Sequence, residues 1–337
     1  MTFRHGDIFD KYSSVDYVSR YWHSGGIEIT LNSQITPYNS GLSLNMYQSY
    51  IYYNWGHNDT TIFLSFNIFN GIRLILLDNR TAQYSIDIHL DGSIVIYSGT
   101  TGSTVIGSMP VGTLDITRFW YSIQAKIVID SVNGSIELRK SGLSTPFLTL
   151  NNVNTRGGTS NNYVNEYEFD GIDGNHAYLN NPAVWSGDST APNNWVGELR
   201  GHSLLPSNSV QSQFAITGAA NNVAAVQTAD GDTSYISTTT AGNKDIVSFT
   251  SLPSITGSYN IIGVQPWVVW RRSDIGLLSA GLSISANGSA DTSVLISNEI
   301  LSNPYSFAYA FEAKDPTNAV WNQTSVNSIN LGVTKIA

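Results

Sequence analysis

Three carboxylates are spaced two residues apart in the segment Glu166-Tyr167-Glu168-Phe169-Asp170. Because side chains of an extended strand alternate between its two faces, we expect all three acids on one face. Retaining glycoside hydrolysis requires two carboxyl groups about 5–5.5 Å apart, one serving as acid and the other as nucleophile. The alternative is a polar, solvent-facing strand whose other face buries Tyr167 and Phe169. The segment therefore raises the hypothesis of a glycan-cleaving enzyme next to that of an ordinary strand.

Oxygen-bearing side chains continue beyond this segment at Asp170, Asp173 and Asn175, with glycines between them. Calcium takes about six to eight oxygen ligands on flexible loops of this kind, so the three residues are a candidate Ca²⁺ site. Asp and Asn beside Gly are equally the ordinary residues of turns, which need no metal. Asp230 and Asp232 admit the same two interpretations, and in the second Asp232 caps a turn.

Aromatic residues gather in one short stretch, at Tyr47, Tyr50, Tyr52, Tyr53 and Trp55. Strand alternation sends Tyr50 and Tyr52 to one face and Tyr53 to the other, so about half of the cluster must point away from a single core. Such rings stack on sugars and also anchor protein interfaces. The cluster therefore predicts either strand packing with an intersubunit contact or a carbohydrate-binding surface.

Composition argues against several classes of function. The formal net charge of −9 and the low share of charged residues, 12%, argue against nucleic-acid binding. The chain has no cysteine, which excludes disulfides and thiolate metal sites. The histidines show neither metal-ligand spacing nor a nucleophile motif, and the glycine-rich segments lack a phosphate-binding Lys-Ser/Thr. No apolar run is long enough for a membrane span or a signal peptide, so we expect folding in the cytosol without membrane insertion.

Short runs of alternating apolar and polar residues, separated by turn formers, fill the chain from residue 21 to about 185. This pattern is typical of antiparallel strands in a β-sandwich. Asp91-Gly92 and Asn133-Gly134 predict two tight hairpin turns with positive φ angles. The strands around them are expected at residues 60–69, 73–77, 85–90, 93–97, 122–130 and 135–139.

Turn formers at residues 185–194 mark the end of a first domain, so we place the domains at 1–190 and 191–337. The second domain also favours strands, and one short helix is expected within residues 315–330, with Pro316 near its start and Gly332 past its end. The fold class is therefore all-β, with a sandwich followed by a smaller β-rich domain. Its expected strands include residues 245–249, 259–265 and 268–270.

Residues 229–246, which read ADGDTSYISTTTAGNKDI, closely resemble a motif that recurs in structural proteins of tailed bacteriophages. Further segments extend the resemblance in matching order and spacing, and together they span most of the chain. The upstream segments are similar to the lectin-like half of such proteins, and they are residues 119–121, 125–139 and 195–200. The downstream segments are residues 263–266, 271–272 and 309–321.

The resemblance implies a concanavalin A-like (LamG-like) jelly roll in the first domain and a place in the virion, assembled in the host cytoplasm. We expect a non-enzymatic structural component associated with the tail, baseplate or fibre and contacting host surface glycans. Decoration of the capsid or collar is the alternative. Other virion proteins, further copies of this chain in a homo-oligomer and host surface polysaccharide are the expected partners.

A glycan depolymerase using Glu166, Glu168 or Asp170 is the third hypothesis. Lectin-like hydrolases carry their acid and nucleophile on one strand in the order Glu, Asp, Glu, and this segment departs from that arrangement in order and composition. Related lectin-like folds often hold Ca²⁺ near carbohydrate, so the resemblance is compatible with the candidate calcium loop. No other cofactor is expected.

Overall fold

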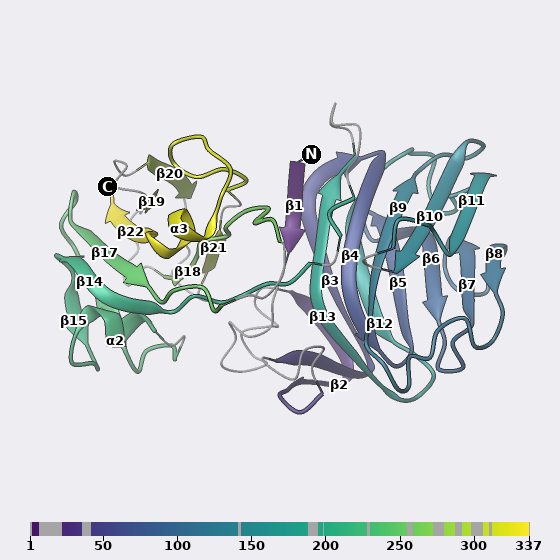
Figure 1. Ribbon diagram of the computed structural model, residues 1–337, viewed down its shortest axis with the longest axis horizontal. Coiled ribbons are helices and arrows are strands. Elements are labelled where there is room, and N and C mark those ends of the chain that lie inside the picture. The colour runs from purple at the N-terminus through teal and green to yellow at the C-terminus, as the bar shows by residue number, and fades with distance from the viewer. Residues whose placement is uncertain are drawn as a thin grey trace. The chain divides into compact units, whose positions relative to one another are not determined.

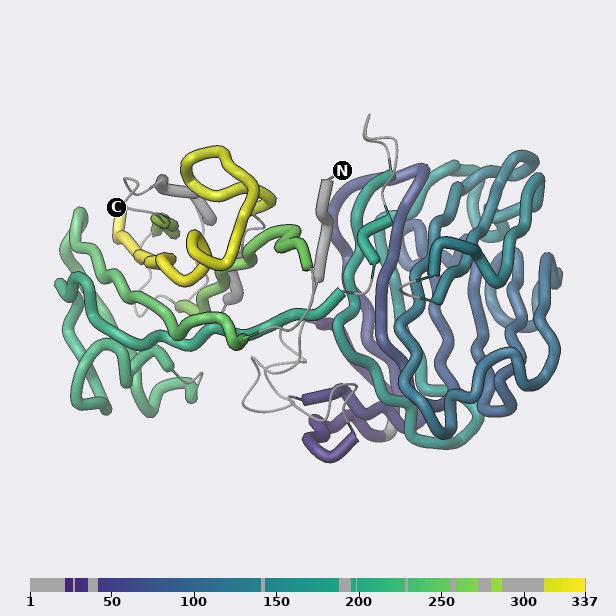
Figure 2. Tube along the Cα trace, in the orientation of Figure 1, coloured from purple at the N-terminus to yellow at the C-terminus, as the bar shows by residue number. Residues whose placement is uncertain are grey.

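The chain forms two compact units, Met1–Gly201 and His202–Ala337. The residues described by the computed structural model are 2–6, 22–35, 42–140, 143–187, 195–197, 199–227, 230–254, 259–271, 280–286, 292–297, 306–309 and 312–336. Within them strands predominate, and the helices are two short ones in the second unit. Figure 1 labels the elements, and Figure 2 follows the chain through each unit.

The first unit is built from one continuous antiparallel sheet of thirteen strands. Its main path runs β11-β10-β9-β4-β13-β3-β12-β5-β6-β7-β8, while β1 pairs with β13 and β2 with β3. The strands are β1 (Thr2–Gly6), β2 (His23–Asn32), β3 (Ser43–Asp59), β4 (Thr61–Phe69), β5 (Ile72–Asp78), β6 (Thr81–Ile88), β7 (Ile94–Ser98), β8 (Thr104–Met109), β9 (Tyr121–Val128), β10 (Gly134–Lys140), β11 (Leu148–Val153), β12 (Val164–Gly171) and β13 (His176–Ser186).

This sheet folds back on itself into two facing layers. The rings of Phe66 on β4 and Phe169 on β12 meet edge to face at 5.2 Å, which places the core between the layers. At the far ends of the path, Gly107 of β8 lies against the side chain of Leu150 of β11, because a Cβ at Gly107 would come within 2.5 Å of it. The predicted all-β jelly-roll sandwich is thereby confirmed.

The hairpin between β6 and β7 forms where Asp91-Gly92 predicts it. Gly92 has φ 78°, and its N–H donates to the carbonyl of His89, while the His89 N–H donates to the carbonyl of Ser93. The loop is therefore one residue longer than the predicted two-residue turn. Longer hairpin loops of this kind place a glycine in the left-handed region.

The hairpin between β9 and β10 is present, but its turn differs from the prediction. Neither Asn133 nor Gly134 has a positive φ. Instead, the Asp130 carboxylate accepts hydrogen bonds from the backbone N–H groups of Val132 and Asn133, both at 2.8 Å. The side chain of Asp130, the last residue of the predicted strand, thus replaces the expected backbone turn.

The second unit contains a five-stranded antiparallel sheet, in the order β14-β17-β22-β19-β20, and two two-stranded pairs, β15-β16 and β18-β21. Trp321, Val326 and Ile329 pack with Ile284 into its core. The elements are β14 (Pro206–Ser212), β15 (Ala215–Thr217), α2 (Asn222–Val226), β16 (Tyr235–Ser237), β17 (Lys244–Phe249), β18 (Trp267–Trp270), β19 (Ala280–Ser285), β20 (Thr292–Ser297), β21 (Ser306–Tyr309), α3 (Gln323–Asn327) and β22 (Asn330–Lys335).

The helix predicted within residues 315–330 is much shorter than that range. Asp315 accepts hydrogen bonds from the N–H groups of Thr317 and Ala319, and Asn318 has φ 68°, so a turn precedes the helix. Helix α3 begins only after Asn322, whose side chain caps it. Gly332 lies inside β22, and residues 259–265 contribute one isolated bridge in place of the predicted strand.

The segment after residue 190, which the sequence assigns to the second domain, belongs in part to the first unit. Trp195 meets Phe63 edge to face at 5.2 Å, and the guanidinium of Arg139 lies 4.0 Å from the Trp195 ring centroid. Leu199 packs on the same apolar cluster. Because these residues cover the outside of β4 and β13, the boundary between the compact units falls at Gly201 rather than at residue 190.

Candidate functional site

Strand β12 presents different chemistry on its two faces. Tyr167 and Phe169 are fully buried in the core, and Glu166, Glu168 and Asp170 point away from it, as strand alternation predicts. Glu166 and Glu168 are nevertheless only 3% and 8% exposed, so this is not a simple solvent-facing strand. Strands β3, β12, β5 and β6 each direct some side chains away from the core. We call this set of side chains the outer face.

Arg80, in the turn between β5 and β6, pairs with two of the three acids. Its Nη2 lies 2.8 Å from Oε2 of Glu168, and its Nη1 lies 3.6 Å from Oε2 of Glu166. Glu166 also accepts a hydrogen bond from Nδ2 of Asn54 at 2.8 Å. A buried carboxylate without a partner is strongly unfavourable, so Arg80 stabilises both glutamates at this depth.

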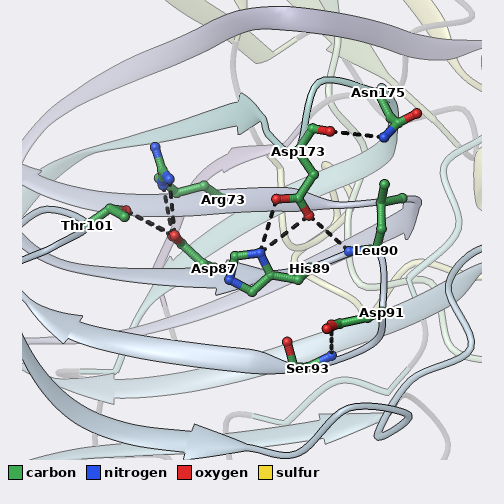
Figure 3. A network of polar contacts seen from close by, with 9 residues as sticks. All are labelled: Arg73, Asp87, His89, Leu90, Asp91, Ser93, Thr101, Asp173 and Asn175. Atoms are coloured by element: carbon green, nitrogen blue, oxygen red, sulfur yellow. Dashed lines mark hydrogen bonds and ion pairs between the residues drawn. The ribbon is translucent and has the colours of Figure 1, made fainter.

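Arg73 makes the corresponding contacts one step further across the sheet. Its Nε and Nη2 donate to Oδ1 and Oδ2 of Asp87 at 2.8 and 3.0 Å, and the Thr101 hydroxyl donates to the same carboxylate (Figure 3). The Arg73 Nη1 lies 3.6 Å from Oδ2 of Asp170. We call the whole set of paired groups the charged row: Arg80, Glu166, Glu168, Asp170, Arg73 and Asp87.

The pKa of the Asp170 carboxyl lies well above that of a free aspartate. Burial and the negative charge of Glu168 together raise this pKa to about 7, and Arg73 opposes both effects. The Asp170 and Glu168 carboxyl groups lie within hydrogen-bonding distance of each other. The buried Oδ1 of Asp170 meets no donor among the described residues, and a proton shared with Glu168 would supply one.

This geometry does not favour hydrolysis by the row. Two carboxyl groups that share a proton are closer together than the about 5–5.5 Å of a retaining pair, and no water fits between them as an inverting pair requires. Glu166 and Glu168 are also held by Arg80. The row can hold a proton between Glu168 and Asp170, and its other polar groups are engaged with one another.

The predicted aromatic cluster divides between the two faces. Tyr53 and Trp55 point into the sandwich, where Nε1 of Trp55 donates to Asp59 at 2.9 Å. Tyr50 and Tyr52 lie on the outer face, as the alternation predicts. The Tyr52 ring is stacked on His23 at 4.6 Å between centroids.

The guanidinium of Arg80 lies 3.6 Å from the centroid of the Tyr52 ring. Together, Arg80 and His23 cover both faces of this ring. Tyr50 lies across the backbone of Gly25, where an added Cβ would come within 2.6 Å of its hydroxyl. The half-buried Tyr47 packs on His176 with 5.1 Å between ring centroids. These rings pack on protein groups, and a binding role for them stays a prediction.

The candidate calcium residues are directed to different partners. Asp170 faces Arg73 and Glu168, whereas Asp173 accepts a hydrogen bond from the N–H of Leu90 at 3.0 Å. Nδ2 of Asn175 donates to the carbonyl of Asp173, as an ordinary turn residue does. Within the part of the chain that the structure describes, no three His, Cys, Asp or Glu side chains are grouped as metal ligands. The Ca²⁺ hypothesis therefore gains no support from the loop geometry.

A wide, open hollow of about 420 Å³ lies where the β6–β7 hairpin meets the Asp173 loop. Nδ1 of His89 lies 3.1 Å from Oδ1 of Asp173, and the N–H of Ser93 donates to Oδ1 of Asp91 at 2.9 Å (Figure 3). The hollow adjoins the charged row, because its Val95 is the cross-strand partner of Asp87. Its lining consists of His89, Leu90, Asp91, Ser93, Val95 and Asp173.

Sequence reasoning found the acids of this region and missed their partners. Arg73 and Arg80 become neighbours of Asp170 and Glu168 only through the pairing of β5 with β12, which joins residues about ninety positions apart in the chain. The turn chemistry of Asp91-Gly92 predicts the hairpin, and that hairpin supplies every lining residue of the hollow except Asp173. Only the strand register could have revealed that it faces Asp173.

In the second unit, Asp230 and not Asp232 caps the turn. The Asp230 carboxylate accepts hydrogen bonds from the N–H and the hydroxyl of Ser234, at 3.0 and 2.8 Å. Asp232 instead forms an ion pair with Arg271. The pair joins two of the segments that carry the sequence resemblance.

Comparisons with known proteins bear on the fold. No family model matches the sequence, and no curated protein matches it either. Solved structures match part of this chain at low identity. None of the helices among the described residues is long and apolar enough to cross a membrane. At these identities and TM-scores the likeness carries no argument about function.

Three of the similar structures illustrate the range. The VIP36 exoplasmic/lumenal domain in its Ca²⁺/Man-bound form is 12% identical, with a TM-score of 0.36, over 57% of this chain and 93% of that one. Lectin II from Ulex europaeus is 10% identical, with a TM-score of 0.36, over 54% and 98%. A glycosyl hydrolase family protein from Mycobacterium fortuitum is 9% identical, with a TM-score of 0.36, over 55% and 100%.

Proposed function

We propose that this chain is a non-enzymatic binding protein whose first unit binds saccharide in the hollow beside the charged row. One observation carries the proposal: the hollow is a concave surface whose polar groups retain hydrogen-bonding capacity. Among the described residues nothing bonds Nε2 of His89, and the Asp91 carboxylate accepts hydrogen bonds from Ser93 and from its own backbone N–H. A carboxylate offers about four lone-pair positions, so Asp91 can still accept from sugar hydroxyls.

The size and mixed lining of the hollow support this use. Its volume of about 420 Å³ falls within the roughly 300–1,000 Å³ of small-molecule sites. Leu90 and Val95 add apolar surface beside the polar groups of His89, Asp91 and Asp173. A pyranose has the same combination, with hydroxyl groups at its edge and C–H groups on its faces.

The test is glycan binding by the full chain, measured on a glycan array and then by calorimetry. Replacing His89 with Ala should weaken binding at least tenfold, because the replacement removes the free Nε2 and releases the Asp173 carboxylate. His57→Ala is the matched control, since His57 is an exposed histidine on β3 outside the hollow. Absence of binding to any glycan, or equal effects of the two variants, would refute the proposal.

The place of this protein in a tailed phage particle is a proposal that rests on the sequence resemblance of residues 229–246 and the segments around them. A host-facing position at the tail, baseplate or fibre suits a saccharide-binding unit, and capsid or collar decoration is the alternative. Electron cryomicroscopy of intact particles decides between them. A tail-tip location with the hollow open to solvent supports adhesion, whereas a capsid or collar location with the hollow covered by a neighbour supports decoration.

The depolymerase hypothesis is the less supported one, because Glu168 and Asp170 are close enough to share a proton and Arg80 holds Glu168. Its test is sugar release from capsular or cell-wall polysaccharide by the wild-type chain and the Glu168→Gln variant. Release by the wild type that the variant abolishes would restore the hydrolase hypothesis.

A further inference from the structure

The hollow carries negative charge that its own lining does not balance. Two carboxylates, Asp91 and Asp173, line it, and neither lysine nor arginine is among its lining residues. Hydrogen bonds from the hydroxyl and the N–H of Ser93 lower the pKa of Asp91, so this exposed group stays ionised at neutral pH. A ligand in the hollow therefore meets a negative potential.

The backbone donors that would bind an anion are already engaged. Anion sites in proteins commonly use several free N–H groups of one loop. In this hairpin the N–H of Leu90 donates to Asp173, and the N–H of Ser93 donates to Asp91. The N–H groups of His89 and Gly92 close the hairpin itself.

Arg73, in the adjoining charged row, cannot make up for this lack of donors. Figure 3 shows the Arg73 guanidinium directed at Asp87, to which it donates two hydrogen bonds, and its third nitrogen faces Asp170. Turning Arg73 toward the hollow would leave Asp87, whose side chain is 1% exposed, with the Thr101 hydroxyl as its remaining donor. An unpaired buried carboxylate is too unfavourable for that exchange.

We infer that the hollow selects saccharides by charge, accepting neutral sugars and sugars with a free amine and rejecting acidic sugars such as uronic and sialic acids. The inference rests on the proposed saccharide-binding function and deepens it. Its physical basis is the difference between hydroxyl or ammonium groups, which can donate to Asp91 and Asp173, and a carboxylate, which can only accept. The glycans it predicts as targets are neutral or amine-bearing chain ends.

The experiment follows the backbone amide signals of Leu90 and Ser93 in the full chain by NMR. Matched sugars that differ in one substituent are added: glucose, glucosamine and glucuronate, and the same three forms of galactose. We expect saturable shifts with the neutral and amine forms, and at least tenfold weaker binding of the uronates. Equal or tighter binding of the uronates at the hollow overturns the inference while leaving saccharide binding intact.

Two further outcomes separate the two proposals. Saturable shifts on the outer face and not at Leu90 or Ser93 would overturn the inference and leave glycan binding by another surface. No saturable shift anywhere with any of the six sugars would overturn both proposals together. Both outcomes are measured on the unmodified chain, so neither depends on whether a variant folds.

A charge variant tests the cause of the selectivity. Asp91→Asn removes one negative charge from an exposed position, so it should raise the affinity for each uronate relative to that for the matched neutral sugar at least threefold. Glu137→Gln makes the same charge change on β10, outside the hollow, and should leave this relative affinity unchanged. Identical relative affinities in the wild type and Asp91→Asn would show that Asp91 does not set the selectivity.

Discussion

The charged row and the hollow lie side by side on one sheet and use the same residue types, yet they differ in what their polar groups have left to bind. In the row, Arg73 and Arg80 hold Asp87, Glu166 and Glu168 in direct ion pairs. In the hollow, the carboxylates are held by backbone N–H groups and a histidine, and they remain open to solvent on one side. The comparison teaches that the carboxylates able to take a ligand are those whose partners leave them hydrogen-bonding capacity.

The largest effect should come from breaking the row at Arg73. Arg73→Met leaves Asp87 buried without its bidentate partner, and losing one side of such a pair costs about 3–5 kcal/mol. For a unit of this size, that lowers the melting temperature of the first unit by roughly 6–20 °C in calorimetry. The double variant Arg73→Met/Asp87→Leu should recover much of the loss, because the unpaired charge is then absent. A single variant as stable as the wild type would show that the row does not stabilise the fold.

The next effect is a pH dependence that belongs to Asp170. Burial and the charge of Glu168 raise its pKa to about 7, against 3.8 for a free aspartate, with Arg73 opposing. Between about pH 4 and pH 7 the folded state therefore holds a proton that the unfolded state releases. The resulting contribution to the free energy of unfolding is complete below about pH 4 and is lost as the pH rises to about 7.

Asp170→Asn should remove most of that dependence. Between pH 8 and pH 5 the wild type is expected to gain on the order of 2 kcal/mol in its free energy of unfolding, and the variant much less. Urea unfolding of the full chain at both values measures it. Asp115→Asn, at an exposed position outside the row, is the control. Parallel pH profiles for wild type and Asp170→Asn would rule out the shared proton.

A smaller effect should follow from removing the ring between Arg80 and His23. Tyr52→Leu loses one cation–π contact and one ring stack, together worth about 1–2 kcal/mol of stability. We expect the saccharide affinity to stay as it is, because both faces of this ring are already covered. A variant that folds normally but loses glycan binding would move the binding site from the hollow to the outer face.

The smallest expected change in stability comes from a substitution at Gly71, which lies against Asp173. A Cβ at Gly71 would lie 3.0 Å from Oδ2 of Asp173, so Gly71→Ala must displace that carboxylate by a few tenths of an ångström. We expect less than about 1 kcal/mol of destabilisation but a severalfold loss of saccharide affinity. Gly281→Ala, whose added Cβ meets nothing closer than 3.4 Å, is the control for the substitution itself. Unchanged affinity would show that the position of Asp173 is not critical.

Sequence patterns predict this fold well where the information is local. The strands around Asp91-Gly92 and the opposite directions of Tyr52 and Tyr53 follow from alternation and turn chemistry within a few residues. The patterns fail where a side chain overrides the backbone, as Asp130 does in the β9–β10 turn and Asp315 does before α3. Both failures lie in connections, where the hydrogen bonds accepted by one side chain decide the conformation.

Only part of the candidate site could be predicted from the sequence, for the same reason. Glu166, Glu168 and Asp170 are neighbours in sequence, so their common face could be predicted. Their pairing with Arg80 and Arg73 depends on which strand lies beside β12, and no local pattern specifies that. Predicting the hollow requires still more information, because only the strand register places the β6–β7 hairpin beside Asp173.

The alternation along β12 also bears on how this sheet assembles correctly. A slip of one residue against β5 would turn Glu166, Glu168 and Asp170 into the apolar core and expose Tyr167 and Phe169. It would also separate Arg73 from Asp170. The charges of the outer face thus act during folding as a check on strand register, adding the cost of buried charge to that of exposing Tyr167 and Phe169.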